Sequence, residues 1–310
     1  MQTAIHLTRC VLGTAGLGGV WGRVDKKKSL QTILTALESG ITSIDTAPAY
    51  GDAEELIGSA MRQWKGSRPI ISTKVGRLES NSAHDGIYDY SPEGMIKSVE
   101  GSLRTLGVEV IDVLFLHEPL AISDRNKLPG IVEQMQEFKR KAYAEKIGIG
   151  GNIPEWFLPY TTSGIFDVVM EYNRLDACCQ DALSSSLPYC KQQGMEFYAA
   201  SPLHMGLLGD HFETYTNSPP DWLHQSDIEK ARLLKKIADK YQMSLPSLAH
   251  RFLFSLDEDF KIVIGPSNMH QLCETLDDIR PEALPQHILE EMMNLREGNS
   301  MYMECMGDEV

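Results

Sequence analysis

Short apolar segments alternate along the chain with segments whose apolar residues recur every three or four positions, and this alternation occurs eight times. Short apolar runs are typical of buried strands, whereas the wider spacing is typical of helices with one buried face. The predicted strands are residues 9–13, 43–45, 69–73, 113–117, 146–150, 168–172, 196–199 and 261–265. Strands separated by helices pair in parallel through right-handed crossovers. Eight such units predict a (β/α)8 barrel in which residues 1–310 form a single domain.

The segments between the strands carry helix signals of their own. One helix is predicted to begin at Ser91-Pro92, an N-cap followed by a first-turn proline, and to end at Gly107. Further helical faces lie at residues 30–37, 131–138 and 228–241. Residues 79–90 and 205–227 exceed ordinary loop length, which is typical of functional lids or of disorder. We expect the tail, residues 297–310, to fray or to fold over the end of the barrel.

Composition narrows the class of protein. Hydrophobic residues make up 42% of the 310 positions, which is enough for a large core. The formal charge of −14 argues against nucleic acid and anionic membranes as partners, because both require a basic surface. The sequence contains no secretory signal and no apolar run long enough to span a membrane. Its six cysteines lack CxxC and zinc-type spacing, so we expect reduced thiols, no metal site and a cytoplasmic location.

Ionisable residues end three consecutive predicted strands. Asp45 closes "TSIDTA", Lys74 closes "PIISTK" and His117 closes "DVLFLH", while Tyr50 lies on the loop just after Asp45. The carboxyl ends of barrel strands meet at one end of the barrel, called here the barrel mouth, where such folds place their active sites. Because a buried Asp or Lys is costly unless it is paired, we expect these groups to contact one another.

This set of residues is suited to proton transfer at a carbonyl oxygen. A phenol is ordinarily a poor proton donor at neutral pH, and a nearby ammonium group lowers its pKa. We therefore expect Lys74 to lower the pKa of Tyr50, Asp45 to keep Lys74 charged, and a neutral His117 to donate a hydrogen bond to the substrate oxygen. Tyr50 would be the general acid. A hydride donor would complete the reaction.

Four segments closely resemble the aldo-keto reductases: "GITSIDTAPAYGDAEELIG", "ISTKVG", "DVLFLHEP" and "ASPLHMGLLG". Members of that family are (β/α)8-barrel oxidoreductases that use NADH or NADPH without a Rossmann fold. The resemblance extends from about Leu12 to Leu276 and implies a catalytic tetrad of Asp45, Tyr50, Lys74 and His117.

The resemblance also implies cofactor contacts. The family's Ser-Asn after the fifth strand is replaced by Gly150 and Gly151, with Asn152 one position later, and its sixth-strand Gln by Glu171. Ala200 replaces the aromatic residue that stacks on the nicotinamide in many members. The cofactor contacts implied by the resemblance are Asn152, Glu171, Ser201, Leu203, Gly206, Gly265, Ser267, Gln271, Glu274 and Thr275.

Gln271 stands where many NADPH-preferring members have an Arg that binds the 2′-phosphate, and Gly265 where others have a Lys. A dianionic phosphate would gain no charge-assisted hydrogen bonds from these two residues. The sequence therefore favours NAD(H) over NADP(H), unless a Lys or Arg from elsewhere compensates.

Among family members, "LGTAGLGGVWG" and "STKVGRL" look most like the aldose dehydrogenases, which oxidise the anomeric carbon of sugars such as L-fucose or L-galactose. In that direction Tyr50 would act as the base. A sugar site needs an aromatic platform and several polar groups. The predicted substrate contacts are Trp21, Tyr88 and Trp222, with His84 and Tyr90 as further candidates.

Two other classes of function remain open. A barrel lyase could use Lys74 as a Schiff-base nucleophile, but Asp45 would stabilise the charged ammonium rather than the free amine. A nucleotide-binding regulatory subunit on the same fold could retain the tetrad with little turnover. "GTAGLGG" lacks the spacing of a dinucleotide fingerprint. The sequence does not determine the natural substrate, the physiological direction or the oligomeric state.

Overall fold

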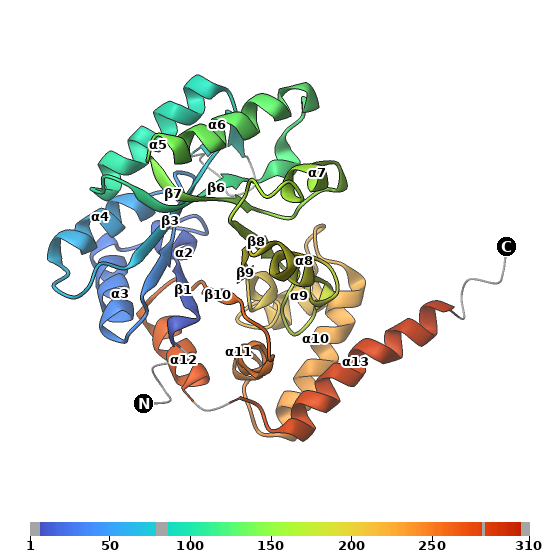
Figure 1. The fold of residues 1–310 in the computed structure, drawn as a ribbon. Coiled ribbons are helices and arrows are strands. Elements are labelled where there is room, and N and C mark those ends of the chain that lie inside the picture. The colour runs from blue at the N-terminus through green and yellow to red at the C-terminus, as the bar shows by residue number, and fades with distance from the viewer. Residues whose placement is uncertain (1–6, 79–85, 281–282, 305–310) are drawn as a thin grey trace.

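Eight parallel strands close into a barrel, in the order β1-β10-β9-β8-β7-β6-β3-β2 around its circumference. The computed structural model describes residues 7–78, 86–280 and 283–304 (Figure 1). The barrel strands are β1 (Cys10–Gly13), β2 (Ser43–Asp45), β3 (Ile70–Val75), β6 (Ile111–His117), β7 (Ala144–Gly150), β8 (Val168–Tyr172), β9 (Glu196–Ala200) and β10 (Lys261–Ile264). All eight predicted strands are present, and the predicted (β/α)8 fold class is confirmed.

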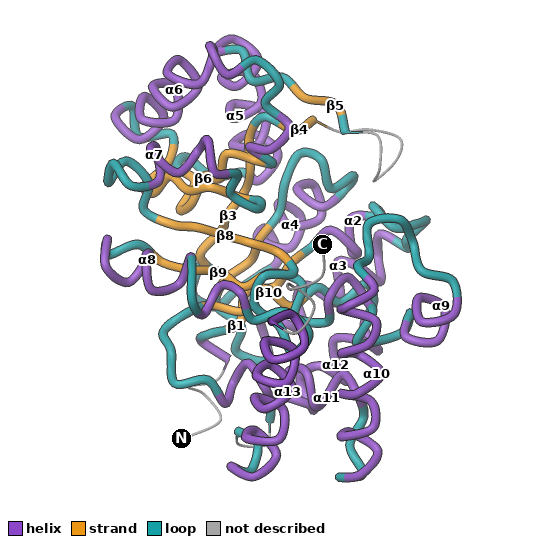
Figure 2. Tube along the Cα trace, turned by 90° about the vertical axis from the view of Figure 1, so that its right-hand side faces the viewer, coloured by secondary structure: helices purple, strands orange, loops and turns teal. Residues whose placement is uncertain are grey.

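Helices surround the barrel and connect successive strands (Figures 1 and 2). They are α2 (Ala15–Gly18), α3 (Lys26–Glu38), α4 (Ala53–Gln63), α5 (Pro92–Leu106), α6 (Leu128–Arg140), α7 (Leu158–Thr161), α8 (Ser186–Gln193), α9 (Phe212–Asn217), α10 (Gln225–Lys240), α11 (Leu245–Ser255), α12 (Met269–Ile279) and α13 (Gln286–Glu304). Short 3-10 turns occur at Pro119–Ala121, Arg125–Lys127, Glu155–Phe157, Asp181–Leu183 and His204–Gly206. None of the described helices is long and apolar enough to cross a membrane.

Helix α5 begins after Ser91 and ends at Gly107, as the sequence predicts. The Ser91 hydroxyl accepts a hydrogen bond from the Gly94 N–H at 3.1 Å, which satisfies one of the free donors at the helix start. Gly107 ends the helix in the left-handed conformation, at φ 72°, which a glycine adopts without steric cost.

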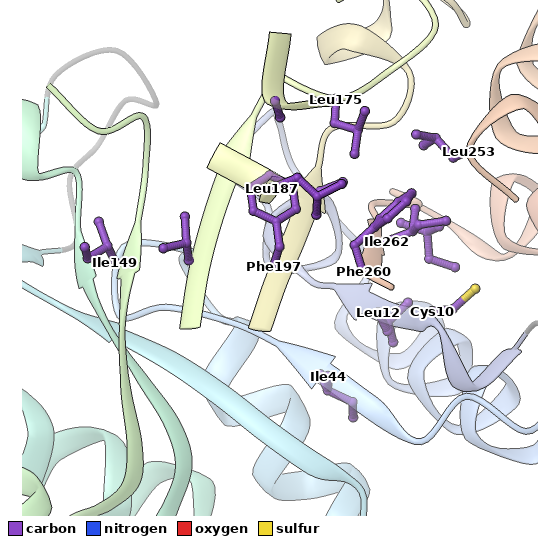
Figure 3. Packing of buried hydrophobic residues seen from close by; sticks show 14 of the residues in the cluster. Cys10, Leu12, Ile44, Ile149, Leu175, Leu187, Phe197, Leu253, Phe260 and Ile262 are labelled. Carbon is purple, nitrogen blue, oxygen red and sulfur yellow. The ribbon is translucent and has the colours of Figure 1, made fainter. Parts of the chain in front are cut away.

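The core has two parts. The larger part lies between the strands and the helices, and Figure 3 shows some of its side chains, including Leu12, Phe197 and Ile262 from three strands. The smaller part fills the barrel interior with Val11, Val113, Phe115, Val168, Met170, Tyr198 and Val263. A Cβ on Gly148 would lie 2.7 Å from the Phe115 ring, so this glycine makes room for the ring. The packed interior closes the barrel below the residues at its mouth.

The long segments are only partly loop. Residues 205–227 contain the short helix α9. The segment 79–90 contains β5 (Ile87–Tyr88), which pairs antiparallel with β4 (Arg77–Leu78) just before it. Residues 79–85, which include the candidate His84, lie outside the described residues. Helix α13 continues to Glu304 and extends outward beside α10 (Figure 1). The rest of the tail also lies outside the described residues.

Candidate active site

Three ionisable side chains from neighbouring strands meet at the barrel mouth. Asp45 is the last residue of β2, Lys74 the last but one of β3, and His117 the last of β6, and these strands pair directly with one another. The three residues are only 2%, 2% and 3% exposed. Parallel pairing in register therefore brings together the groups that the sequence places at the strand ends.

Lys74 and Asp45 form a buried ion pair. Nζ of Lys74 lies 2.5 Å from Oδ2 of Asp45 and also donates to the carbonyl oxygen of Thr46 at 2.8 Å. The Ser72 hydroxyl donates to the other Asp45 oxygen at 2.8 Å. Burial alone would lower the pKa of Lys74, but Asp45 and Tyr50 together outweigh burial and the pKa is raised. Lys74 is therefore charged, as expected.

Tyr50 lies against this ion pair. Nζ of Lys74 is 4.6 Å from the centre of the Tyr50 ring. The backbone of Tyr50 packs closely on α2, because a Cβ on Gly18 would lie 1.9 Å from the Tyr50 carbonyl oxygen. Burial raises the pKa of Tyr50 above its usual value, and the charge of Lys74 only opposes this rise. The expectation of a lowered pKa is therefore wrong, and Tyr50 is a neutral phenol.

His117 completes the group as a neutral imidazole. Its ring meets the Tyr50 ring edge to face, with ring centres 5.8 Å apart. Burial, and next the charge of Lys74, hold the pKa of His117 well below its usual value. A neutral imidazole carries one donor and one acceptor nitrogen. Its Nδ1 is buried and has no hydrogen-bond partner among the described residues.

Buried amide oxygens lie at the ends of the next two strands. Oδ1 of Asn152, just after β7, and Oδ1 of Asn173, just after β8, accept no hydrogen bond within the described part of the chain. Buried polar atoms are normally paired, so two unpaired acceptors beside the tetrad fit the carboxamide of a nicotinamide cofactor. Asn152 was predicted from the sequence, but Asn173 was not, because its left-handed backbone (φ 53°) leaves no signal in the residue pattern.

Glu171 has a different position from the predicted one. Side chains alternate along β8, and because Met170 faces the barrel interior, Glu171 faces the helices. Burial raises the pKa of Glu171, and hydrogen bonding by Ser186 of α8 opposes this rise. This orientation does not support a direct contact of Glu171 with the nicotinamide.

The segment that follows β9 is held in an unusual conformation. Ser201, His204 and Met205 are left-handed, at φ 60°, 49° and 52°, as is Gly206 at 96°. The Ser201 hydroxyl contacts the sulfur of Met205 at 3.3 Å, and Leu203 is partly buried against the core. A Cβ on Gly206 would lie 2.6 Å from the His211 ring.

A buried charged histidine anchors this segment. Nδ1 of His204 lies 2.8 Å from Oδ2 of Asp176, and its Nε2 lies 3.6 Å from Oδ2 of Asp227 at the start of α10. Asp176 also accepts the backbone N–H groups of Cys178 and Cys179. Burial alone would lower the pKa of His204, but Asp176 and Asp227 raise it to about 10. These residues are far apart in the sequence, which gave no signal for the contact.

The turn after β10 contains the remaining predicted cofactor contacts. A Cβ on Gly16 would lie 2.3 Å from the Ser267 hydroxyl oxygen, whereas one on Gly265 would meet nothing within 4 Å. Gln271 Oε1 accepts the Ser267 N–H at 2.7 Å, and its Nε2 donates to Oδ2 of Asp210 at 2.7 Å. The second turn of α12 places Glu274 toward solvent and buries Thr275.

Of the aromatic residues predicted to bind substrate, Tyr88 is linked to the tetrad through Tyr90, whereas Trp21 and Trp222 are not. Tyr88 stacks on Tyr90, with ring centres 6.0 Å apart, and the Tyr90 hydroxyl reaches the His117 carbonyl oxygen at 2.8 Å. Trp222 packs on Tyr215, and Trp21 is 57% exposed in the segment after α2. Neither Trp21 nor Trp222 forms a ring contact or hydrogen bond with the tetrad among the described residues.

Comparison with known proteins identifies the family of this site and fold. The Aldo/keto reductase family model matches residues 9–293, and the chain belongs to that family. It is 26% identical to the NADH-specific methylglyoxal reductase of Escherichia coli over 297 residues (88% of this chain, 90% of the relative). It is also 26% identical to the L-galactose dehydrogenase of Arabidopsis thaliana over 284 residues (89% and 85%).

A third relative, the D-threo-aldose 1-dehydrogenase of a Pseudomonas species, is 24% identical over 287 residues (86% and 87%). Among solved structures, the glycerol dehydrogenase of Gluconobacter oxydans superposes with a TM-score of 0.73 at 23% identity (92% of this chain, 90% of that chain). The holo form of an aldo-keto reductase from Bacillus halodurans gives 0.74 at 20% identity (93% and 91%). These relatives support a nicotinamide-dependent oxidoreductase, and the two structures share its fold.

Proposed function

We propose that the chain oxidises the anomeric carbon of an aldose to the lactone with NAD+, and reduces carbonyl compounds in the reverse direction. The observation that carries this proposal is the buried contact of Asp45, Lys74, Tyr50 and His117 at the barrel mouth. The relatives that act on L-galactose and on D-threo-aldoses support the sugar as substrate.

Each member of the tetrad has a distinct role in this proposal. In the reductive direction Tyr50, a neutral phenol, protonates the carbonyl oxygen, and the charged Lys74 stabilises the phenolate that remains. Asp45 holds Lys74 in place and keeps it charged. Neutral His117 donates a hydrogen bond that orients the substrate oxygen. In the oxidative direction the phenolate form of Tyr50, which the charge of Lys74 stabilises, removes the proton of the anomeric hydroxyl.

The cofactor supplies the chemistry that these side chains lack. A nicotinamide cofactor held at this site would supply hydride transfer to and from the anomeric carbon. The amide oxygens of Asn152 and Asn173 would accept the N–H groups of its carboxamide, since both are buried without a partner among the described residues. Residues 201–210 and 265–271, after β9 and β10, would hold the rest of the dinucleotide.

Two features favour NAD(H). Both polar atoms of the Gln271 side chain are hydrogen-bonded: its oxygen accepts the Ser267 N–H, and its nitrogen donates to Asp210. The sequence from Gly265 to Thr275 contains no Lys or Arg, and Asp210 adds a carboxylate beside Gln271. A 2′-phosphate near this pair would gain no cationic partner there and would meet a negative charge.

The proposal is tested by a substrate panel. Purified protein is mixed with NAD+ or NADP+ and each of several aldoses at mildly alkaline pH, and nicotinamide reduction is followed. Small aldehydes with NADH or NADPH are tested in parallel. We expect at least one aldose to reduce NAD+ faster than NADP+. Tight nucleotide binding without turnover of any sugar or aldehyde would instead indicate the regulatory-subunit alternative.

A further inference from the structure

Glu118 follows the tetrad residue His117 and is held in a strained conformation. Its backbone is left-handed, at φ 53°, which is uncommon for a residue with a side chain. The Glu118 N–H donates to the Gly150 carbonyl oxygen at 2.8 Å, and its own carbonyl oxygen accepts from the Ala121 N–H at 2.9 Å. Strained residues persist where surrounding contacts fix them, and they cluster at functional sites.

Tyr90 also holds the backbone of Glu118 in place. The Tyr90 hydroxyl lies 2.8 Å from the carbonyl oxygens of both His117 and Glu118. Tyr90 packs tightly over Gly76, where a Cβ would lie 2.3 Å from its ring. Tyr90 also stacks on Tyr88 of the β4–β5 hairpin. Tyr90 and Gly150 therefore hold the peptide that joins His117 to Glu118.

The carboxylate of Glu118 lies over the end of β7. Its Oε2 is 3.2 Å from the position that a Cβ on Gly151 would occupy. Burial raises the pKa of Glu118, and the nearby charges of Arg77 and Lys74 oppose that rise. Burial is the main cause of the raised pKa of Tyr50 and of Tyr172, which reaches about 12, and the charge of Glu118 adds to both. The side chain of Glu118 therefore lies at the barrel mouth, over the end of β7.

This carboxylate is left without a direct partner. Within the described ranges it accepts no hydrogen bond and forms no ion pair, and the residue is half-buried. Its oxygens are therefore free to accept hydrogen bonds from a bound ligand. A carboxylate has only acceptor sites, so the ligand groups that fit it are hydroxyls or a cation.

We propose that Glu118 is a specificity-determining residue, whose carboxylate accepts hydrogen bonds from hydroxyl groups of a polyhydroxylated substrate with its reacting carbon beside Tyr50. The inference rests on the proposed function, in which the substrate is a sugar. A site built to bind a substrate hydroxyl rejects the analogue that lacks it, because the polar group of the site is then left unpaired. Glu118 would therefore favour aldoses over simple aldehydes of the same length.

The test compares glyceraldehyde with propanal, which has the same number of carbon atoms and no hydroxyl groups. Both are reduced with NADH by the wild type, Glu118→Ala, Glu118→Gln and Glu118→Asp. We expect Glu118→Ala to lower kcat/KM for glyceraldehyde by at least ~10-fold more than for propanal, mainly through KM. Glu118→Asp should recover part of the loss. Thermal unfolding confirms that each variant is folded.

Glu145→Gln is the matched control, because Glu145 is exposed near the opposite end of β7. It should leave the ratio of the two kcat/KM values unchanged. An equal loss for both aldehydes would overturn the inference and assign Glu118 to positioning His117 or the cofactor. No loss for either would exclude a substrate contact. A wild type that reduces neither aldehyde, and oxidises no aldose, would overturn the proposed function itself.

Discussion

The ammonium group of Lys74 lies 2.5 Å from the carboxylate of Asp45, and both groups are almost completely buried. Removing one partner of a buried ion pair leaves an uncompensated charge and costs about 3–5 kcal/mol of stability. We expect Asp45→Asn and Lys74→Met to show this loss in urea unfolding. The double variant should regain most of the stability but none of the activity. Equal stability of the single and double variants would contradict a coupled pair.

The ion pairs of His204 with Asp176 and Asp227 should make the free energy of unfolding fall as the pH rises into the alkaline range. The pKa of His204 is raised to about 10 in the folded protein, against about 6.5 in the unfolded chain. Its contribution is therefore fully present below about pH 6.5 and is lost as the pH rises toward 10. We expect His204→Gln to be less stable than the wild type at pH 6, and this difference to shrink by pH 10.

The control for His204 is His270→Gln, because His270 is 82% exposed beside Glu274. It should change the free energy of unfolding little at either pH. A gap between wild type and His204→Gln that stays constant from pH 6 to 10 would mean that His204 is not held as a cation by Asp176 and Asp227.

The pH profile of carbonyl reduction should be flat across neutral pH. The proton donor Tyr50 has a pKa above its usual value of about 10, and His117 has one well below 6.5. We therefore expect kcat for reduction to vary little between about pH 6.5 and 9 and to fall only at higher pH. Steady-state rates in buffers of constant ionic strength measure this. An acidic limb centred near 6.5 would show that His117 titrates in this range and is not held neutral by burial.

Eight strands could be predicted because their apolar runs are short and are separated by clear helical faces, as in the stretch that ends at Asp45. The meeting of Asp45, Lys74 and His117 followed from strand order, since parallel neighbours end at the same face of the barrel. The tetrad that includes Tyr50 was implied by the resemblance to the aldo-keto reductases. The pKa of Tyr50 was predicted with the wrong sign because burial, which depends on the packed structure, outweighs the charge of Lys74.

Other features of the site could not be read from the sequence. The orientation of Glu171 depends on which face of β8 turns inward, and both of its faces are buried. The contact of His204 with Asp176 joins two connecting segments that carry no periodic pattern. Pairings of this kind depend on how neighbouring loops pack at the barrel mouth.

The pair of Asp210 and Gln271 provides a test of cofactor preference. We expect Gln271→Arg to tighten NADP+ binding by at least ~10-fold, because an arginine supplies charge-assisted hydrogen bonds to a phosphate. Asp210→Asn should also tighten it, because a negative charge is removed beside the phosphate. Dissociation constants from fluorescence titration measure both effects without turnover. Wild-type binding of NADP+ tighter than NAD+ would contradict the preference.

In the proposed reaction Tyr50 transfers the proton while hydride leaves the anomeric carbon. The most direct measurement uses an aldose that carries deuterium at C1, with NAD+ and either the wild type or Tyr50→Phe, and follows deuterium on the nicotinamide by NMR. We expect deuterated NADH from the wild type, and a rate at least ~100-fold lower from Tyr50→Phe with unchanged NAD+ affinity. Transfer by Tyr50→Phe at the wild-type rate would contradict this role of Tyr50.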